Sequence, residues 1–459
     1  MTIAGERDLW PALAAPPRPA RPLSTWKLLR IGLRNSLAAC DDALFDELFV
    51  ERRFLWHRAF VVSDPDGVKR VLQDNFENYP RLSQNRRVFH FGSGGGMLSI
   101  HGETWRRHRR LINPALDHRA AQRDAPTLIQ VTADLLPYLD ELPDGSELDI
   151  GDIVTLWLTL ATGHVFAGDD RAIDPMLLAM GQYPGEFSYL DALPLPGFVD
   201  RWRRSRRAAE AYFPLLDRMI AERQRADYAG REDLLWKLAT AHDRQTGERL
   251  SDAELRDEIL TLGSTAATPI RPLCWVWYLL ATHPAVEERL HAELDAVLGG
   301  RPPSVEEIGR LTYLRAIVDE TMRLYPPLPA MLRSAVADDT VCGRHIPKNS
   351  IVAIVPWVVH RHRKLWEAPD RFDPDRFLPA QAAGRSRYVY LPFSIGPHVC
   401  IGASLGMMEI MVGVAMLAQR FRFRLVPDHP VEAAAWTNLR PKYGIRVTLE
   451  RRGGPVPAG

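Results

Sequence analysis

A ten-residue segment, residues 393–402, constrains this chain of 459 residues more than any other feature, and it reads Phe-Ser-Ile-Gly-Pro-His-Val-Cys-Ile-Gly. Cys400 lies between Gly396 and Gly402, and a long apolar stretch follows from residue 403 to residue 418. Glycine allows positive φ and a close approach of the backbone to a flat group. The segment therefore predicts a tight turn that presents a sulfur just before a helix, where free amide groups can lower the proton affinity of a thiolate.

A thiolate in such a turn is the axial ligand with which haem iron favours cleavage of the oxygen–oxygen bond. The pattern Phe-x-x-Gly-x-His-x-Cys-x-Gly resembles the haem-binding loop of the cytochrome P450 family. The resemblance implies haem b as the cofactor and Cys400 as the thiolate ligand of its iron. The other cofactor-binding residues implied in this loop are Phe393, Gly396, His398 and Gly402. Taken alone, the segment also fits a buried, unreactive cysteine beside a turn.

Further motifs follow the order and spacing of the same family. Glu320 and Arg323 are three residues apart in a helical stretch, so they share a helix face. Residues 372–377, Phe-Asp-Pro-Asp-Arg-Phe, resemble the family's meander segment, with Asp375 where glutamate is usual. In the family the helix pair locks onto the meander arginine, which implies a buried ionic triad of Glu320, Arg323 and Arg376.

The motif Trp105-x-x-x-Arg109 matches the helix that reaches a haem propionate in this family. By position, Arg333 corresponds to the residue that binds the other propionate. His398 stands where many family members carry arginine, and the resemblance implies a hydrogen bond to a propionate rather than catalysis. For Arg333 and His398 the alternative is a surface cation. The resemblance covers roughly the whole chain from about residue 25.

The family implies a mainly α fold with a small β region, built as one large domain over residues 26–459 after a proline-rich arm over residues 1–25. Local patterns agree with this class. Ser251 and Ser304 each precede a glutamate by three residues, which is the capping-box pattern of a helix start. Short stretches rich in β-branched and aromatic residues, at 60–62 and 351–355, predict strands.

Composition excludes several other classes of protein. The chain is 46% apolar and 25% charged, as in an ordinary globular protein, and a net charge of +1 gives no reason to expect binding to nucleic acid. The four cysteines form no C-x-x-C pair. The N-terminus lacks a basic-then-apolar leader, and the longest apolar run contains Glu409, so we expect no membrane span and a soluble, cytoplasmic protein.

The chain departs from the family in the helix expected on the distal side of the haem. Family members carry Ala-Gly-x-(Asp/Glu)-Thr there, where an acid and an alcohol deliver protons to iron-bound dioxygen, but residues 262–272 contain no carboxylate. Counting back from the Trp-Val-Trp-Tyr segment that begins at residue 275 places Thr268 at the alcohol and Ala267 at the acid. A one-residue shift would let Ser264 or Thr265 serve instead.

Two prolines make the same segment unusual. Pro269 and Pro272 each remove an amide donor and disfavour helix at the preceding residue, so we expect the helix to break or kink at 268–272. The alternative is that substrate or ordered water supplies the protons and the site is otherwise ordinary.

The substrate is predicted only as a class. Four segments, residues 88–97, 185–195, 329–332 and 436–437, correspond to the walls of the distal pocket in the family and are mostly apolar and aromatic. A hydrophobic small molecule suits such a cavity.

The resemblance implies monooxygenation, with electrons from a separate ferredoxin or flavodoxin system. The alternatives are a peroxide-using enzyme, a coupling or rearrangement enzyme, and a haem sensor without turnover. On the Trp105 helix, Arg106, Arg107 and Arg110 are expected to offer a basic surface to an acidic electron carrier, or merely to be solvated.

Overall fold

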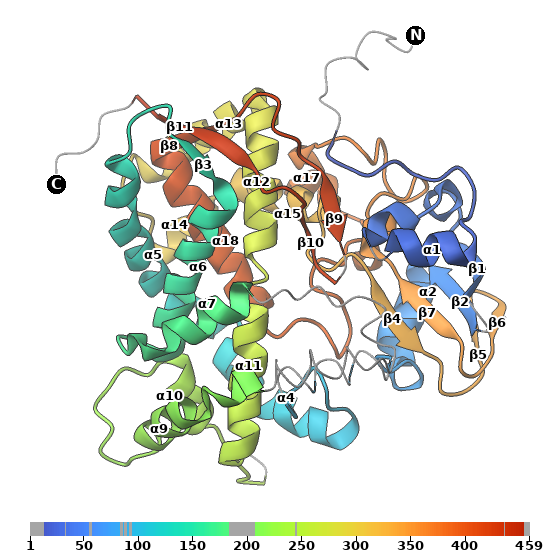
Figure 1. Ribbon diagram of the computed structural model, residues 1–459, viewed down its shortest axis with the longest axis horizontal. Helices are drawn as coiled ribbons and strands as arrows, with labels where there is room; N and C mark the ends of the chain where they lie inside the picture. The colour runs from blue at the N-terminus through green and yellow to red at the C-terminus, as the bar shows by residue number, and fades with distance from the viewer. Residues whose placement is uncertain are drawn as a thin grey trace.

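The computed structural model describes residues 13–32, 34–54, 57–82, 86, 90, 94–182, 207–243, 246–435 and 437–453 (Figure 1). Helices dominate this part of the chain. The longer ones are α4 (Gly102–Leu116), α5 (His118–Asp140), α6 (Ile150–Ala167), α11 (Asp252–Ala266), α12 (Ile270–Thr282), α13 (Pro284–Leu298), α15 (Thr312–Leu324) and α18 (Ala403–Arg420). The shorter ones are α1 (Thr25–Gly32), α2 (Pro65–Lys69), α7 (Asp174–Gln182), α9 (Phe213–Arg223), α10 (Leu234–Ala239), α14 (Val305–Arg310), α16 (Pro356–Val359) and α17 (Pro379–Ala382).

Short strands form small sheets beside this helical body (Figure 1). The largest has the order β1-β2-β7-β4, in which β2 and β7 are parallel and the other pairs are antiparallel. A three-stranded sheet has the order β3-β11-β8, and β5–β6 and β9–β10 are two-stranded. The strands are β1 (Phe49–Phe54), β2 (His57–Val62), β3 (Glu147–Asp149), β4 (Met331–Ser334), β5 (Asp339–Val341), β6 (Arg344–Ile346), β7 (Ile351–Ile354), β8 (Phe421–Leu425), β9 (Ala433–Ala435), β10 (Leu439–Pro441) and β11 (Arg446–Arg451). The predicted class, mainly α with a small β region, is confirmed.

Local sequence signals account for several of the helix boundaries. Ser251 caps α11 and Ser304 caps α14, each through a capping box with the glutamate three residues on, as predicted. Helix α13 begins at Pro284, whose missing amide costs nothing in a first turn, and ends at Gly299, whose φ of 58° is left-handed. Both predicted strand segments are present, within β2 and β7.

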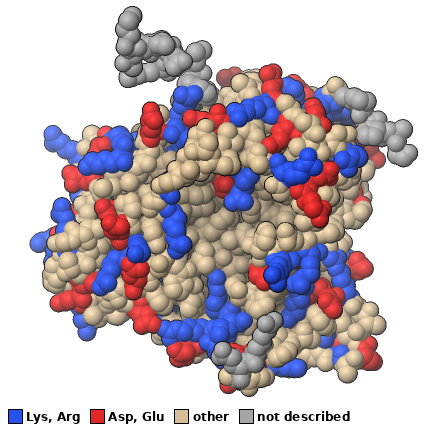
Figure 2. Space-filling view, turned by 180° about the vertical axis from the view of Figure 1, so that it is seen from behind, with Lys and Arg blue, Asp and Glu red and all other residues tan. Residues whose placement is uncertain are grey.

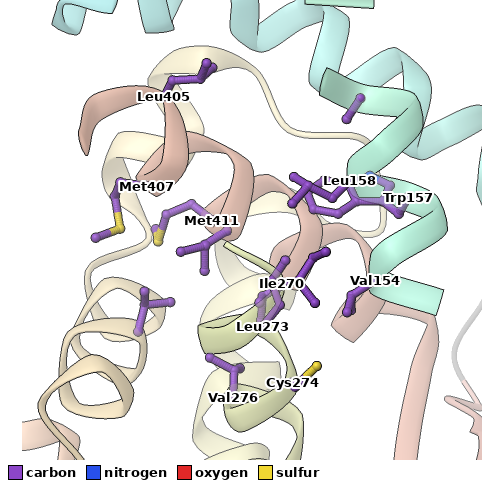
Figure 3. Close-up of a cluster of buried hydrophobic side chains, with 14 of the residues drawn as sticks. Val154, Trp157, Leu158, Ile270, Leu273, Cys274, Val276, Leu405, Met407 and Met411 are labelled. Carbon is purple, nitrogen blue, oxygen red and sulfur yellow. The ribbon is translucent and has the colours of Figure 1, made fainter. Parts of the chain in front are cut away.

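The main hydrophobic core lies where α6, α12 and α18 meet (Figure 3). Trp157 of α6 lies over Gly413 of α18, where even a methyl group would approach the indole ring to 2.8 Å. The indole Nε1 donates to Thr132 Oγ1 of α5 at 2.8 Å, so this buried polar atom is paired. Glycine at 413 therefore sets how closely α6 and α18 can pack.

Two features concern the predicted N-terminal arm and the predicted absence of a membrane span. The described part of the arm lies against the body of the protein, because Arg18 forms an ion pair with Asp370 at 2.6 Å and lies over the ring of Phe45. Among the described residues, α6 alone is long and apolar enough to cross a membrane by length and composition. That is weak evidence for a span, since 56% of this helix is buried inside the protein.

Candidate active site

The segment that carries Cys400 folds into a tight turn that ends at the start of α18. The amide of Cys400 donates to the carbonyl of Phe393 at 2.8 Å, and the amide of Val399 donates to the carbonyl of Gly396 at 3.0 Å. Gly396 has a φ of +75°, and a Cβ there would collide with the carbonyl oxygen of Leu72 in the short helix η3 (Arg70–Asp74). Its role is therefore to let the turn pack against η3.

Gly402 has a different role from Gly396. Its φ is −88°, and a Cβ there would meet no atom within 4 Å. The space beside Gly402 is open, whereas Gly396 faces Leu72. That both glycines bind the cofactor stays a prediction.

The electrostatics of Cys400 are less favourable to a free thiolate than its position suggests. Crowding by the surrounding protein raises the pKa of the Cys400 thiol, although the residue is exposed, and the amide of Gly402 and the guanidinium of Arg109 lower the pKa by less. The amide groups at the start of α18 do not by themselves provide a thiolate. A bound metal cation does, because a coordinating thiol is deprotonated.

Four cationic or potentially cationic groups converge beside this turn: Arg81, Arg109, Arg333 and His398. Burial lowers the pKa of Arg333 to about 9 and that of Arg81 to about 10, and in each case a second arginine lowers it further. Burial, together with the charges of Arg81, Arg333 and Arg109, lowers the pKa of His398 to about 3. The imidazole of His398 lies over Trp105, with ring centroids 4.0 Å apart. These side chains therefore lie close together with Trp105. The motifs predicted this for every member of the group except Arg81.

The exception is Arg81, which the sequence analysis missed. It forms an isolated β-bridge with Arg333, and its guanidinium donates to the carbonyl of Met97 at 3.2 Å. No motif surrounds it, and only its pairing with β4, far along the chain, brings it to the site. Arg81 follows a proline and has no sequence motif around it that would predict a place in the site.

This group of residues fits the acidic side chains of a haem. Among the described residues, no carboxylate forms an ion pair with Arg81, Arg109 or Arg333, and Nδ1 of His398 has no hydrogen-bond partner. Buried charges without partners are costly, so the site suits a ligand that brings two negative groups of its own. One face of the molecule is hollowed at its centre, with mostly uncharged residues in the depression and Lys and Arg side chains near its margin (Figure 2).

The predicted ionic triad is present. Glu320 and Arg323 of α15 are fully buried and joined by two hydrogen bonds, of 2.6 and 2.8 Å. Arg376 contributes its Nε at 3.5 Å from Glu320 Oε1. Arg323 also donates to three backbone carbonyls, those of residues 360, 369 and 371, so the triad ties α15 to the meander. Asp375, in the glutamate position, is instead half-exposed and paired with Arg289 at 2.7 Å.

The predicted break in the distal helix is also present. Helix α11 ends at Ala266, residues 267–269 form a turn, and α12 begins at Ile270. Pro272 falls in the first turn of α12, where no intrahelical amide is required, so only the 267–269 segment is interrupted. The hydroxyl of Thr265 donates to the carbonyls of Thr261 and Leu262 at 3.0 Å each.

The acids upstream of this break have other partners. Asp257 Oδ2 accepts a hydrogen bond from the amide of Gly95 at 2.7 Å, and Glu258 is buried against His108 of α4. Neither carboxylate is in contact with Thr268, which agrees with the interval of about 15 Å expected along a helix.

Much of the expected substrate pocket lies outside the described residues. This holds for residues 87–89, 91–93, 185–195 and 436. Of the described part, Met331 is buried in a second core cluster with the sheet residues Phe60 and Val352. Its side chain packs against the sheet, and the role of residues 329–332 in lining the pocket stays a prediction.

The arginines expected to form a basic surface on α4 all have acidic partners. Arg106 pairs with Glu77 and Glu103, Arg107 with Glu254, and Arg110 with Asp243 at 3.0 Å. These pairs neutralise most of the charge that was expected to attract an acidic electron carrier.

Comparison with known proteins agrees with this geometry. The family model for cytochrome P450 matches residues 16–448. The chain is 33% identical to cyclooctat-9-en-7-ol 5-monooxygenase of Streptomyces melanosporofaciens over 82% of this chain and 83% of that protein, and 27% identical to pentalenene oxygenase of Streptomyces avermitilis over 93% and 94%. The crystal structure of the cytochrome P450DA heme domain superposes with a TM-score of 0.79 at 22% identity, covering 96% of this chain and 98% of that one. This chain therefore belongs to the cytochrome P450 family.

Proposed function

We propose that the protein is a haem-thiolate monooxygenase that oxidises a hydrophobic small molecule with dioxygen and with electrons from a separate ferredoxin or flavodoxin system. The observation that carries the proposal is the meeting of Cys400 with three arginines, Arg81, Arg109 and the buried Arg333, none of which forms an ion pair with a carboxylate of the described residues. Two similar proteins are named for oxygenation of cyclooctat-9-en-7-ol and of pentalenene. We therefore propose cyclic hydrophobic metabolites as the first substrates to test.

The proposed site residues have separate roles in binding haem and in holding a proton. Haem, when bound, supplies the redox centre at which the oxidant is activated. Cys400 supplies its thiolate ligand, while Trp105, Arg109, Arg333 and His398, with Arg81 added, orient the two propionates by charge-assisted hydrogen bonds. Phe393 and the two glycines hold the ligand turn in place. Thr268 is the candidate group that holds a proton on the distal side.

A direct experiment tests the proposal. The purified holoprotein is mixed with a ferredoxin, its reductase and a panel of cyclic hydrocarbons and alcohols, and both substrate-induced changes in the haem spectrum and oxygenated products are measured. Spectral change followed by an oxygenated product is the expected result. Spectral change without any product would favour a haem sensor, and desaturated, coupled or rearranged products would favour the other oxidative chemistries.

The first prediction concerns the oxidant. Because Ala267 replaces the acid that relays protons in the family, reductase-driven turnover should be slow or should release hydrogen peroxide. Peroxide already carries both protons and both electrons, so added peroxide should give product at a comparable or higher rate. Thr268→Ala should lose less than the 10²–10⁴-fold that a placed proton-transfer group is typically worth. Product formed per reduced nicotinamide, with and without catalase, measures this. Tight coupling together with a large loss in Thr268→Ala would contradict the prediction.

The second prediction concerns Arg81. Replacing it by methionine removes one propionate partner, and a hydrogen bond to a charged group contributes about 1.5–3 kcal/mol, so haem affinity should fall by about 10- to 100-fold. The same change removes a repulsive neighbour of Arg333, so the apoprotein should melt at the same or a higher temperature. Haem transfer to an excess of apomyoglobin and thermal unfolding of the apoprotein measure the two effects. Arg58→Met, on an exposed pair with Glu51, is the control. A loss of apoprotein stability would mean that Arg81 has a structural role instead.

A further inference from the structure

A buried histidine–carboxylate pair joins α4 to the distal helix α11. Nδ1 of His108 lies 2.6 Å from Glu258 Oε1, and Nε2 lies 3.3 Å from Glu254 Oε1. His108 is 1% exposed and Glu258 is fully buried, whereas the side chain of Glu254 is 31% exposed. The imidazole thus bridges a carboxylate at the surface and a carboxylate in the interior. Nε2 also lies 3.3 Å from a guanidinium nitrogen of Arg107.

The interior end of this pair carries polar atoms without partners. Glu258 Oε2 and Thr261 Oγ1 are both buried, and neither makes a hydrogen bond of good geometry, although the backbone amide of Met97 lies close enough to lower the pKa of the Glu258 carboxyl. The loop at Gly95 and Gly96 covers them, since a side chain at Gly96 would collide with the hydroxyl of Thr261. Two unpaired polar atoms three residues apart on one helix are suitable partners for a bridging water.

The next hydroxyls on α11 continue along the same side of the helix. At 3.6 residues per turn, positions 258, 261 and 265 of α11 fall within an arc of roughly 60°, and Thr268 follows in the turn after the helix. Neighbours at such spacing lie about 5–6 Å apart, which is too far for a direct hydrogen bond but suits one intervening water. Thr261 is buried, whereas Thr265 is exposed. The line of polar side chains therefore runs from the protein interior at Glu258 to the exposed end of α11, next to the 267–269 turn.

We propose that His108, Glu258 and Thr261 form a proton relay from the surface at Glu254 to the distal side of the haem, in place of the acid that is missing at Ala267. This rests on the proposed use of dioxygen. His108 accepts a proton on Nε2 from the Glu254 side and releases one from Nδ1 to Glu258. Glu258 passes a proton through water to Thr261 and Thr265 and is reprotonated by His108.

The stoichiometry is that of monooxygenation. Two protons cross the relay in each turnover, the ferredoxin or flavodoxin supplies two electrons, one oxygen atom of dioxygen enters the substrate, and the other leaves as water.

Burial raises the pKa of Glu258, and the bond to His108 only partly offsets this, so the carboxyl retains a proton more readily than a surface glutamate does. Because every step from Glu258 onward needs a water, delivery is slower than from an adjacent acid. This agrees with the peroxide release expected above.

The test compares Glu258→Gln with Asp257→Asn, its neighbour on the same helix. Each variant replaces a carboxyl group by an amide, but Asp257 accepts a hydrogen bond from Gly95, whereas Glu258 is the partner of His108. In Glu258→Gln, product formed with ferredoxin and reductase should fall by about 10²-fold, peroxide release should rise and the solvent deuterium isotope effect should increase. Product formed with added peroxide should be unchanged, and Asp257→Asn should behave as wild type in all four measurements.

A second readout does not depend on turnover. The ¹⁵N chemical shifts of the His108 imidazole in the resting holoprotein, which report the hydrogen bond at Nδ1, should change in Glu258→Gln and stay the same in Asp257→Asn. Thr261→Val should repeat the kinetic defect of Glu258→Gln without moving those shifts, and Thr261→Ser should restore activity. A purely structural role for Thr261 would not give rescue by serine together with normal peroxide-driven turnover.

The outcomes separate the relay from the proposed function. Wild-type protein that forms product with peroxide but never with ferredoxin and reductase overturns the dioxygen function and, with it, the relay. Reductase-driven product in wild type that is equally fast in Glu258→Gln and Thr261→Val overturns the relay alone. Equal loss in Glu258→Gln with reductase and with peroxide, or an equal loss in Asp257→Asn, also overturns the relay.

Discussion

Cys400→Ser should abolish the strongly red-shifted Soret band of the ferrous carbon-monoxide complex, which is the spectroscopic signature of a thiolate ligand to haem iron. A serine hydroxyl does not provide the soft, readily deprotonated ligand that favours oxygen–oxygen cleavage. Monooxygenase activity should be lost with the band, because the thiolate is the electron-donating ligand. The measurement is the carbon-monoxide difference spectrum of dithionite-reduced protein at matched haem content.

Cys274→Ser is the matched control for this experiment. Burial raises the pKa of Cys274 to about 12, and the residue lies in the core between α12 and α6 (Figure 3). It lacks the turn and the helix start that frame Cys400, so its replacement should leave the Soret band in place. A red-shifted band that persists in Cys400→Ser, or that disappears in Cys274→Ser, would assign the ligand to another residue.

Glu320→Ala should leave little or no folded, haem-loaded protein. The change removes the partner of Arg323, whose side chain is fully buried, and deprives Arg376 of its carboxylate. Breaking a buried ion pair from one side typically costs about 3–5 kcal/mol, a large fraction of the stability of a globular protein. Soluble yield, haem content and the free energy of unfolding in urea measure the effect.

Asp375→Ala provides the contrast for the Glu320 experiment. Its ion pair with Arg289 is half-exposed on both sides, and such pairs are worth about 0–1 kcal/mol. Asp375→Ala should therefore give normal holoprotein. A stable Glu320→Ala holoprotein that merely turned over slowly would show that the triad acts on chemistry rather than on structure.

Sequence reasoning succeeded where a feature depends on neighbouring residues. The break at 267–269 follows from proline chemistry, the capping boxes from a four-residue pattern, and the turn at Cys400 from its two glycines. The triad depended on the family pattern rather than on local chemistry, because Glu320 and Arg376 are brought together only by the fold.

The failures concern contacts between distant segments. Arg81 reaches the cation cluster only through its bridge to β4, and the α4 arginines are neutralised by partners that include Glu254 and Asp243, more than a hundred residues away. The packing of Gly396 against Leu72 was not predicted, for the same reason. The residues around Gly396 and around Leu72 contain no pattern that predicts this contact.

That contact between Gly396 and Leu72 has a consequence for how the protein is made. The turn that carries Cys400 rests on a segment that is much earlier in the sequence, so it cannot reach its final position until the more than three hundred residues between them have left the ribosome. Contacts of such large sequence separation form slowly. Haem capture is therefore expected late in folding, and protein that lacks haem should accumulate when synthesis outpaces cofactor supply.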